Sequence, residues 1–215
     1  MLNIYLYIKR NFYFMSRYRG PRLRICRRLA ELPGLTQKVS KKQYPPGEHL
    51  NSNRKLSEYG LRLEEKQKLR FNYGINEKQM LKYVKIAKKV SEPTGQVLLQ
   101  LLEMRFDTVV FRLGFAPTIP AARQLINHKH LMIDHKVVSI CSYQCKPGNI
   151  ISINNKPSST QLIQQRFSEL SFNSVPNHLE TDQAKRLGYV KGIVEYQDFL
   201  LGLNELLVVE HYSKK

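Results

Sequence analysis

The chain has 215 residues, and its 35 lysines and arginines exceed its 17 acidic residues so far that the formal net charge is +18. A compact surface with this charge repels itself, and the excess is typical of proteins that lie against a polyanion such as nucleic acid. No run reaches the roughly 18 apolar residues of a membrane-spanning helix, which argues against a membrane protein. Three cysteines without a secretory signal favour a reducing compartment over a disulfide framework.

The N-terminal quarter of the chain carries much of the basic excess. Residues 1–15 are rich in aromatic side chains and lack the features of a signal peptide, so we treat them as an N-terminal extension. Residues 16–57 are interrupted by several Pro-Gly and Gly-Pro steps, which predicts extended segments with room for one short helix. A solvated flexible arm is the alternative, but Tyr18, Leu23 and Ile25 are interleaved with the arginines and disfavour it. The arginines of this segment are predicted to contact phosphates: Arg17, Arg19, Arg22, Arg24, Arg27 and Arg28.

Residues 58–103 are predicted to be helical. A break at 73–74 separates two helices, and Asn76 is placed to cap the second one. That helix has an apolar stripe that includes Met80 and Val84. Its opposite face is predicted to contact phosphates, because it carries five lysines and only one acidic residue lies nearby: Lys78, Lys82, Lys85, Lys88 and Lys89. Residues 96–103 form a further short apolar helix.

Residues 105–153 change character and predict a compact unit of two short helices followed by strands. The first helix stops at Gly114, and the second begins near Thr118 with Pro120 in its first turn. Residues 131–133 and 137–138 flank a turn and predict a β-hairpin. The turn at 146–149 leads into another strand, residues 150–153.

The last part of the chain is neutral and linker-like, and Leu206–Val209 predicts a strand that returns to the body. The fold class is therefore α+β. We expect an extension at 1–15, a basic, mainly helical RNA-binding domain at 16–104, a second RNA-binding domain at 105–165 and a C-terminal segment at 166–215 that packs back on the body.

Several blocks of sequence, in the same order and without large gaps, resemble the family of small-subunit ribosomal protein four, in its chloroplast-encoded branch. The resemblance covers about residues 15–213 and is carried by the segments Ser16–Pro21, Leu32–Thr36, Arg62–Arg70, Thr94–Gln96, Ala121–Leu125, Ser142–Pro147 and Asn204–Glu210. It implies that the unit at 105–165 is the αL RNA-binding domain.

The resemblance also implies a function. A member of this family binds the 5′ domain of small-subunit ribosomal RNA, nucleates assembly of the subunit body and contributes to translational accuracy. Its expected partners are neighbouring small-subunit proteins, including protein five, and messenger RNA where it enters the subunit, with no membrane and no small-molecule substrate. The expected location is the plastid ribosome.

Two features depart from the family. Its hairpin turn commonly reads Asn-Gly, whereas this chain has Asp134-His135 and loses the glycine that accepts positive φ at little cost. Some bacterial members hold zinc with four N-terminal cysteines, whereas this chain has only Cys26 in that region. We therefore expect no metal site and no cofactor.

Cations on the predicted helices of both domains complete the set of expected RNA contacts, because arginine suits bidentate phosphate binding. Asp107 is anionic and is expected to cap a helix or pair with an arginine. The remaining candidates are Arg62, Lys66, Lys68, Arg70, Arg105, Arg112, Arg123, Gln124, His128, Lys129, Lys136 and Lys146. We expect Arg123 to be exposed, because it points away from the apolar stripe formed by Ala122, Leu125 and Ile126.

No catalytic residue is assigned. No nucleophile elbow, phosphate loop or zinc-protease pattern occurs in the sequence. One alternative is an RNA-modifying enzyme of the pseudouridine synthase type, but only 62 residues follow residue 153, too few for its catalytic domain. The other is a free RNA-binding assembly or stress factor that carries the αL domain alone.

Overall fold

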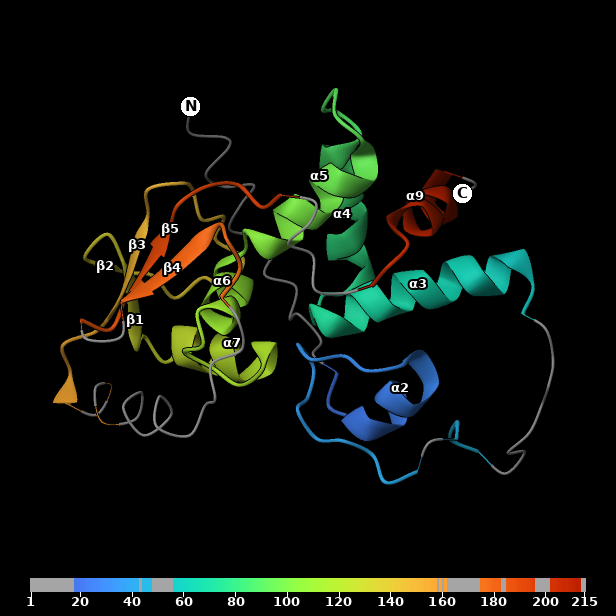
Figure 1. The fold of residues 1–215 in the computed structure, drawn as a ribbon, viewed down its shortest axis with the longest axis horizontal. Coiled ribbons are helices and arrows are strands. Elements are labelled where there is room, and N and C mark those ends of the chain that lie inside the picture. The colour runs from blue at the N-terminus through green and yellow to red at the C-terminus, as the bar shows by residue number, and fades with distance from the viewer. Residues whose placement is uncertain are drawn as a thin grey trace, which may run out of the picture.

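A computed structural model describes residues 18–42, 44–47, 56–157, 159, 161, 175–182, 185–195 and 202–213. Within them the chain forms an α+β fold, as the sequence predicted, with helices gathered on one side and a sheet on the other (Figure 1). The helices are α2 (Arg22–Leu29), α3 (Glu58–Asn72), α4 (Glu77–Ala87), α5 (Thr94–Glu103), α6 (Phe106–Arg112), α7 (Ile119–Asn127) and α9 (Glu205–Ser213). The strands are β1 (Leu131–Ile133), β2 (Lys136–Val137), β3 (Ile150–Ile153), β4 (Leu179–Asp182) and β5 (Leu187–Val190).

The arginine-rich segment contains one short helix, α2, in agreement with the prediction. Ile25 and Leu29 on its inner face are buried with Leu32 and Leu35 of the following loop, and Phe71 of α3 packs against this cluster. The inward residues of α2 are therefore the apolar ones interleaved with the arginines.

Helices α3, α4, α5 and α9 enclose a second core. The α3–α4 break and the cap at Asn76 are confirmed, since Asn76 Oδ1 accepts a 2.8 Å hydrogen bond from the backbone N–H of Gln79. This capping box fixes where α4 starts. Met80, Val84 and Ala87 are buried on its inner face, so its lysines lie on the outer face. No helix in the described ranges has the length and apolar character to cross a bilayer.

The predicted strand at 206–209 is wrong, because these residues belong to helix α9. A short apolar run fits either a strand or a buried helix, and its period alone does not decide. Here Val208, His211 and Tyr212, spaced three and four residues apart, are buried, while α9 packs on α3 and α5. Asn204 Oδ1 accepts a 3.2 Å hydrogen bond from the N–H of Leu206 at the helix start. The expectation that this segment packs back on the body is confirmed.

Helices α6 and α7 pack against each other beneath the sheet and share its core (Figure 1). The predicted cap of α7 is confirmed, since Thr118 Oγ1 accepts a 3.3 Å hydrogen bond from Ala121 N–H. Gly114, after α6, has φ of 80°, as expected of a helix stop. The hairpin of β1 and β2 is also confirmed, with Ile133 paired to Lys136.

The sheet has five antiparallel strands in the order β2-β1-β3-β5-β4. Its last two strands lie in the C-terminal segment, where the sequence had predicted none before residue 206. β5 pairs with β3, with Ile151 opposite Gly188, so residues 179–190 extend the sheet that begins in the αL unit.

The Pro33-Gly34 turn joins the two halves of the molecule. Gly34 N–H donates to Asn72 Oδ1 at 2.9 Å, and Gly34 O accepts from Ile119 N–H at 2.9 Å. The turn therefore lies between the end of α3 and the start of α7, where it fixes the N-terminal segment against both.

Candidate RNA-binding surface

The cations selected from the sequence fall into two groups, and the first is held inside the protein. Arg105 is 1% exposed and forms a paired contact with Asp107, through Nε to Oδ1 at 3.0 Å and Nη2 to Oδ2 at 2.9 Å. Its Nη1 donates to Tyr83 Oη at 2.6 Å. This position does not fit the expected phosphate contact. The expectation that Asp107 pairs with an arginine is confirmed.

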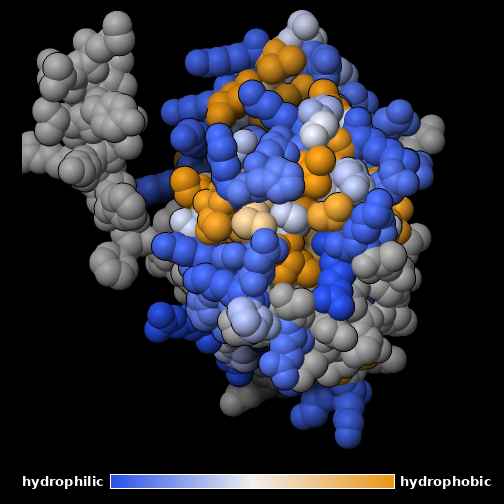
Figure 2. Space-filling view, turned by 90° about the vertical axis from the view of Figure 1, so that its left-hand side faces the viewer, coloured by the Kyte–Doolittle hydropathy of each residue, from blue (hydrophilic) through white to orange (hydrophobic). Residues whose placement is uncertain are grey.

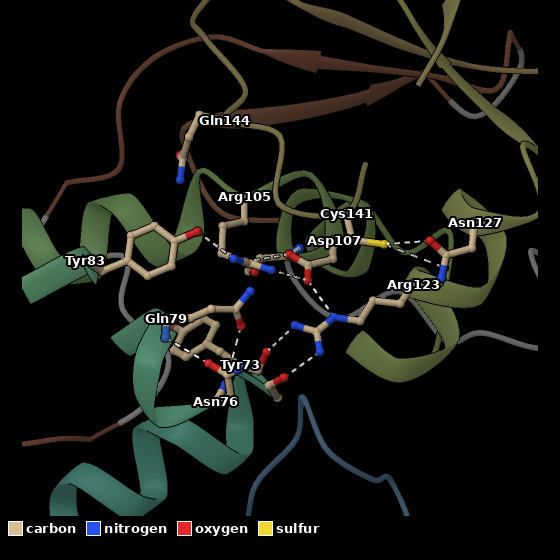
Figure 3. Close-up of polar contacts among 12 residues, drawn as sticks. Tyr73, Asn76, Gln79, Tyr83, Arg105, Asp107, Arg123, Asn127, Cys141 and Gln144 are labelled. Atoms are coloured by element: carbon tan, nitrogen blue, oxygen red, sulfur yellow. Dashed lines mark hydrogen bonds and ion pairs between the residues drawn. The ribbon is translucent and has the colours of Figure 1, made fainter. Parts of the chain in front are cut away.

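The expectation that Arg123 is exposed is wrong. It points away from the stripe of Ala122 and Leu125, as predicted, but the turn between α3 and α4 lies over it, and only 15% of its side chain is exposed. Its Nε donates to Asp107 Oδ2 at 2.7 Å, and its Nη atoms donate to the backbone carbonyls of Tyr73 and Gly74 at 2.7 and 2.5 Å (Figure 3). Arg123 thus joins the αL unit to the helical domain.

Arg112 is also internal. It forms a two-point contact with Glu103, with distances of 3.0 and 2.6 Å, and Tyr73 Oη donates to the same carboxylate at 2.5 Å. Burial alone lowers the pKa of Arg112, but the Glu103 charge outweighs it and raises that pKa above its ordinary value. Burial, reinforced by Glu103, raises the pKa of Tyr73 well above its ordinary value. Arg112 stays charged and Tyr73 stays neutral, so this network ties α3, α5 and α6 together.

Three predicted contacts on α3 pair with acidic residues of the protein. Arg62 bridges Glu58 and Glu210, Lys66 donates to Glu77 at 3.0 Å, and Lys68 lies 2.7 Å from Glu65. These pairs hold α3 to α9 and α4, so the cations are already partly neutralised.

The second group is exposed. Arg27 is half-buried and donates to the Tyr44 and Pro45 carbonyls, and Arg17 lies outside the described residues. The exposed candidates are Arg19, Arg22, Arg24, Arg28, Lys82, Lys85, Gln124, His128, Lys129, Lys136 and Lys146. Lys136 and Lys146 come from the sheet end, a face that is mainly hydrophilic with scattered hydrophobic patches (Figure 2).

A cleft of about 1000 Å³ lies where the arginine-rich segment, the end of α3 and the start of α4 meet α7. Its lining includes four arginines and one histidine and no acidic residue of the described chain. The lining residues are Tyr18, Arg19, Gly20, Arg22, Leu35, Arg70, Phe71, Gly74, Ile75, Asn76, Pro120, Arg123, Gln124, Asn127 and His128. The cleft brings together five predicted contacts besides Arg123, namely Arg19, Arg22, Arg70, Gln124 and His128.

Sequence reasoning did not select Phe71 or Asn76 as part of this site. Phe71 reads as a core residue of an amphipathic helix, and Asn76 reads as a cap, which it also is. Only the approach of α2 and α7 places both at a cleft.

The remaining nucleophilic and metal-binding side chains form no further site in the described part of the chain. No group of three or more His, Cys, Asp or Glu residues there is placed to hold a metal ion. Cys145 is buried, and burial raises its thiol pKa to about 12, so it stays protonated at neutral pH.

The fold and the cleft define a protein with an αL-type unit fixed to a helical domain and a cationic groove between them. Comparisons with known proteins agree. Residues 17–103 match the ribosomal protein S4/S9 N-terminal domain, and residues 104–151 match the S4 domain. The chain belongs to the S4 family of small-subunit ribosomal proteins.

Relatives from red algae and cyanobacteria are similar over nearly the whole chain. The small ribosomal subunit protein uS4c of Pyropia yezoensis is 59% identical over 201 residues, and that of Gracilaria tenuistipitata var. liui is 60% identical over 201 residues. The uS4 protein of Thermosynechococcus vestitus is 58% identical over 201 residues. Each match spans 94% of this chain and 100% of the relative.

Proposed function

We propose that this protein is a structural component of the small subunit of the plastid ribosome, where it binds ribosomal RNA and catalyses no reaction. The observation that carries the proposal is the cleft, where arginines of two domains converge without an acidic residue among the described lining. Such a surface attracts phosphates and releases their counterions. The S4 family and the relatives named uS4c support the ribosomal and plastid assignments.

The RNA contacts are best assigned to the exposed cations. Arg19, Arg22, Arg24 and Arg28 approach phosphates from the N-terminal segment, and α4 adds Lys82 and Lys85 from its outer face. The αL unit contributes Gln124, His128, Lys129, Lys136 and Lys146. Arg105, Arg112 and Arg123 act indirectly, because they hold the two domains in the relative position that the surface requires.

The finer assignment follows the family. The RNA partner is the 5′ domain of small-subunit ribosomal RNA, and binding there nucleates assembly of the subunit body. Ribosomal protein five and incoming messenger RNA are its neighbours, through which it contributes to decoding accuracy. A fixed connection between the two domains supports such a role, since a rigid surface loses little freedom on binding.

The experiment is a titration of the full chain with a transcript of the 5′ domain, and with a transcript of similar length from another domain of the same RNA as control. We expect preference for the 5′ domain. If about 6–10 phosphates are contacted, affinity falls by roughly a thousandfold or more between 50 and 200 mM salt. Equal affinity for both transcripts, or a nearly flat salt response, contradicts the proposal.

A second experiment separates a ribosomal component from a free factor or a modifying enzyme. Organelle extract is sedimented through a density gradient, and the protein is quantified relative to small-subunit RNA. We expect one copy per small subunit across the peak. A protein found mainly at the top of the gradient is a factor.

A further inference from the structure

One wall of the cleft is aromatic. Tyr18 packs edge-on against Phe71, with ring centroids 5.5 Å apart and an interplanar angle of 77°, yet 48% of Tyr18 remains exposed. Gly20 makes this position possible, because a Cβ at that residue would collide with the Tyr18 ring. The chain therefore bends around the tyrosine and holds a half-exposed ring at the rim of the cleft.

Cationic groups surround this wall. The Arg70 guanidinium lies over the Phe71 ring, with Cζ 4.5 Å from its centroid, and the buried Arg70 Nε has no hydrogen-bond partner within the described residues. Arg19 and Arg22 are exposed at the cleft. Arg22 reaches the Leu35 carbonyl only at 3.4 Å, so most of its five N–H donors remain for a ligand.

The other side of the cleft is formed by α7 and offers amide groups. Gln124 and Asn127 are exposed there and can both donate and accept hydrogen bonds. Asn127 Oδ1 already accepts a 3.2 Å contact from Cys141 Sγ, which orients the amide (Figure 3). Leu35, Ile75 and Pro120 add apolar lining between the two sides.

We propose that the cleft holds one unpaired nucleotide of the bound RNA, an inference that rests on the proposed function. The phosphate lies at Arg19 and Arg22, the base stacks on Tyr18, and its edge meets Gln124 and Asn127. Stacking on an aromatic side chain is how proteins hold bases that have left a helix. A phosphate alone would use the arginines but leave the exposed ring and the amides without a function.

The volume fits this occupant. About 1000 Å³ is at the upper end of ligand pockets, which span roughly 300–1,000 Å³. A paired duplex keeps its bases inside its own stack and cannot present one to the Tyr18 ring. The occupant is therefore a loop, bulge or junction nucleotide.

The test compares Tyr18→Leu with Tyr18→Phe in the full chain, titrated with the 5′-domain transcript at fixed salt. Tyr18→Leu removes the ring and should weaken binding about tenfold, within the range measured for loss of one base stack. Tyr18→Phe keeps the ring and should bind within about twofold of the unmodified chain. Tyr59→Leu, at a tyrosine that is 60% exposed on α3 outside the cleft, is the matched control and should change nothing.

The salt dependence separates stacking from charge. Tyr18→Leu should leave the slope of log affinity against log salt unchanged, because no cation is lost, whereas Arg22→Gln should make it shallower by about one contact. If Tyr18→Leu unfolds the N-terminal segment, as judged by thermal melting, Gln124→Ala on the opposite side provides the test and should weaken binding several-fold at an unchanged slope.

Ultraviolet crosslinking at Tyr18, mapped by mass spectrometry, should give one nucleotide that is unpaired in the transcript. The inference is overturned if Tyr18→Leu binds like the unmodified chain, if Tyr18→Phe loses as much affinity as Tyr18→Leu, or if the crosslink lies in a duplex. In those cases the unmodified chain still binds with its full salt slope, and the proposed function stands. Failure of the unmodified chain to prefer the transcript refutes the proposed function itself.

Discussion

Arg123 of α7 and Asp107 of α6 are joined by an ion pair of 2.7 Å, and Asp107 is 0% exposed. The same carboxylate also pairs with Arg105 at 2.9 Å. One buried acid thus orients two arginines, and Arg123 extends the connection to the backbone of Tyr73 and Gly74. The αL unit and the helical domain therefore meet through a polar network.

The first prediction concerns that network. Arg123→Ala should lower the free energy of unfolding by about 2–4 kcal/mol, because it leaves a buried carboxylate with one partner fewer and two carbonyls without a donor. Arg123→Lys should recover only part of this, since lysine cannot reproduce the planar fork. Gln124→Ala, at the exposed neighbour, should change stability by no more than about 0.5 kcal/mol. Thermal melting of the three variants is the measurement, and an unchanged melting temperature in Arg123→Ala would show that the network is dispensable.

The second prediction concerns the turn between the domains. A Cβ at Gly34 would lie 2.7 Å from the Asn72 carbonyl oxygen and 2.8 Å from Ile119 Cδ1. Gly34→Ala should therefore cost about 1–3 kcal/mol through overpacking. Gly192→Ala is the control, because nothing lies within 4 Å of the Cβ it would add. Denaturant unfolding of both variants measures the difference, and equal midpoints would contradict the close contact.

The third prediction concerns the hairpin turn in which Asp134-His135 replaces the family's Asn-Gly. Both residues have positive φ, 48° and 64°. Asp134 compensates, since its carboxylate accepts from Ile150 N–H at 2.8 Å and from Asn149 Nδ2 at 2.6 Å. Asp134→Ala should cost about 1.5–3 kcal/mol, whereas His135→Gly should stabilise by about 0.5–1 kcal/mol through relief of left-handed strain. The melting temperatures should move in opposite directions, and a shift in the same direction would refute this account.

The fourth prediction concerns pH. Burial acts to raise the pKa of Glu77, but hydrogen bonds from Lys66 and Tyr212 outweigh it and hold that pKa below the ordinary 4.5. The stabilisation from Glu77 is therefore complete above about pH 4.5 and lost as the pH falls through the lower folded pKa.

Glu77→Gln should be less stable at pH 7 by about 1 kcal/mol, because the charge-assisted bond to Lys66 is weakened. Its disadvantage should shrink as the pH falls below about 4.5. Melting temperatures of both proteins from pH 7 to 3 provide the test. A difference that stays constant over this range would mean that Glu77 does not titrate as expected.

Local pattern carried much of the fold. Asn76 before an apolar-periodic segment predicted the start of α4, and Thr118 with Pro120 predicted α7, because caps and first-turn prolines act within one turn of helix. The segment at 206–209 was misassigned because four apolar residues carry no decisive period. Strands β4 and β5 were not predicted, since their pairing with β3 is a contact over a long sequence separation.

The sequence by itself determined the class of the protein, its charge and the order of its helical and αL units, because composition, caps and periodicity are local properties. The tertiary structure decided which cations face solvent. Arg105, Arg112 and Arg123 resemble Arg19 and Arg22 in sequence, yet the acids Glu103 and Asp107 lie where the domains meet and bind the first three internally. A charge is used by whichever partner folding brings within hydrogen-bond distance. The cleft likewise exists only because α2, α3 and α7 converge, so its aromatic wall follows from packing.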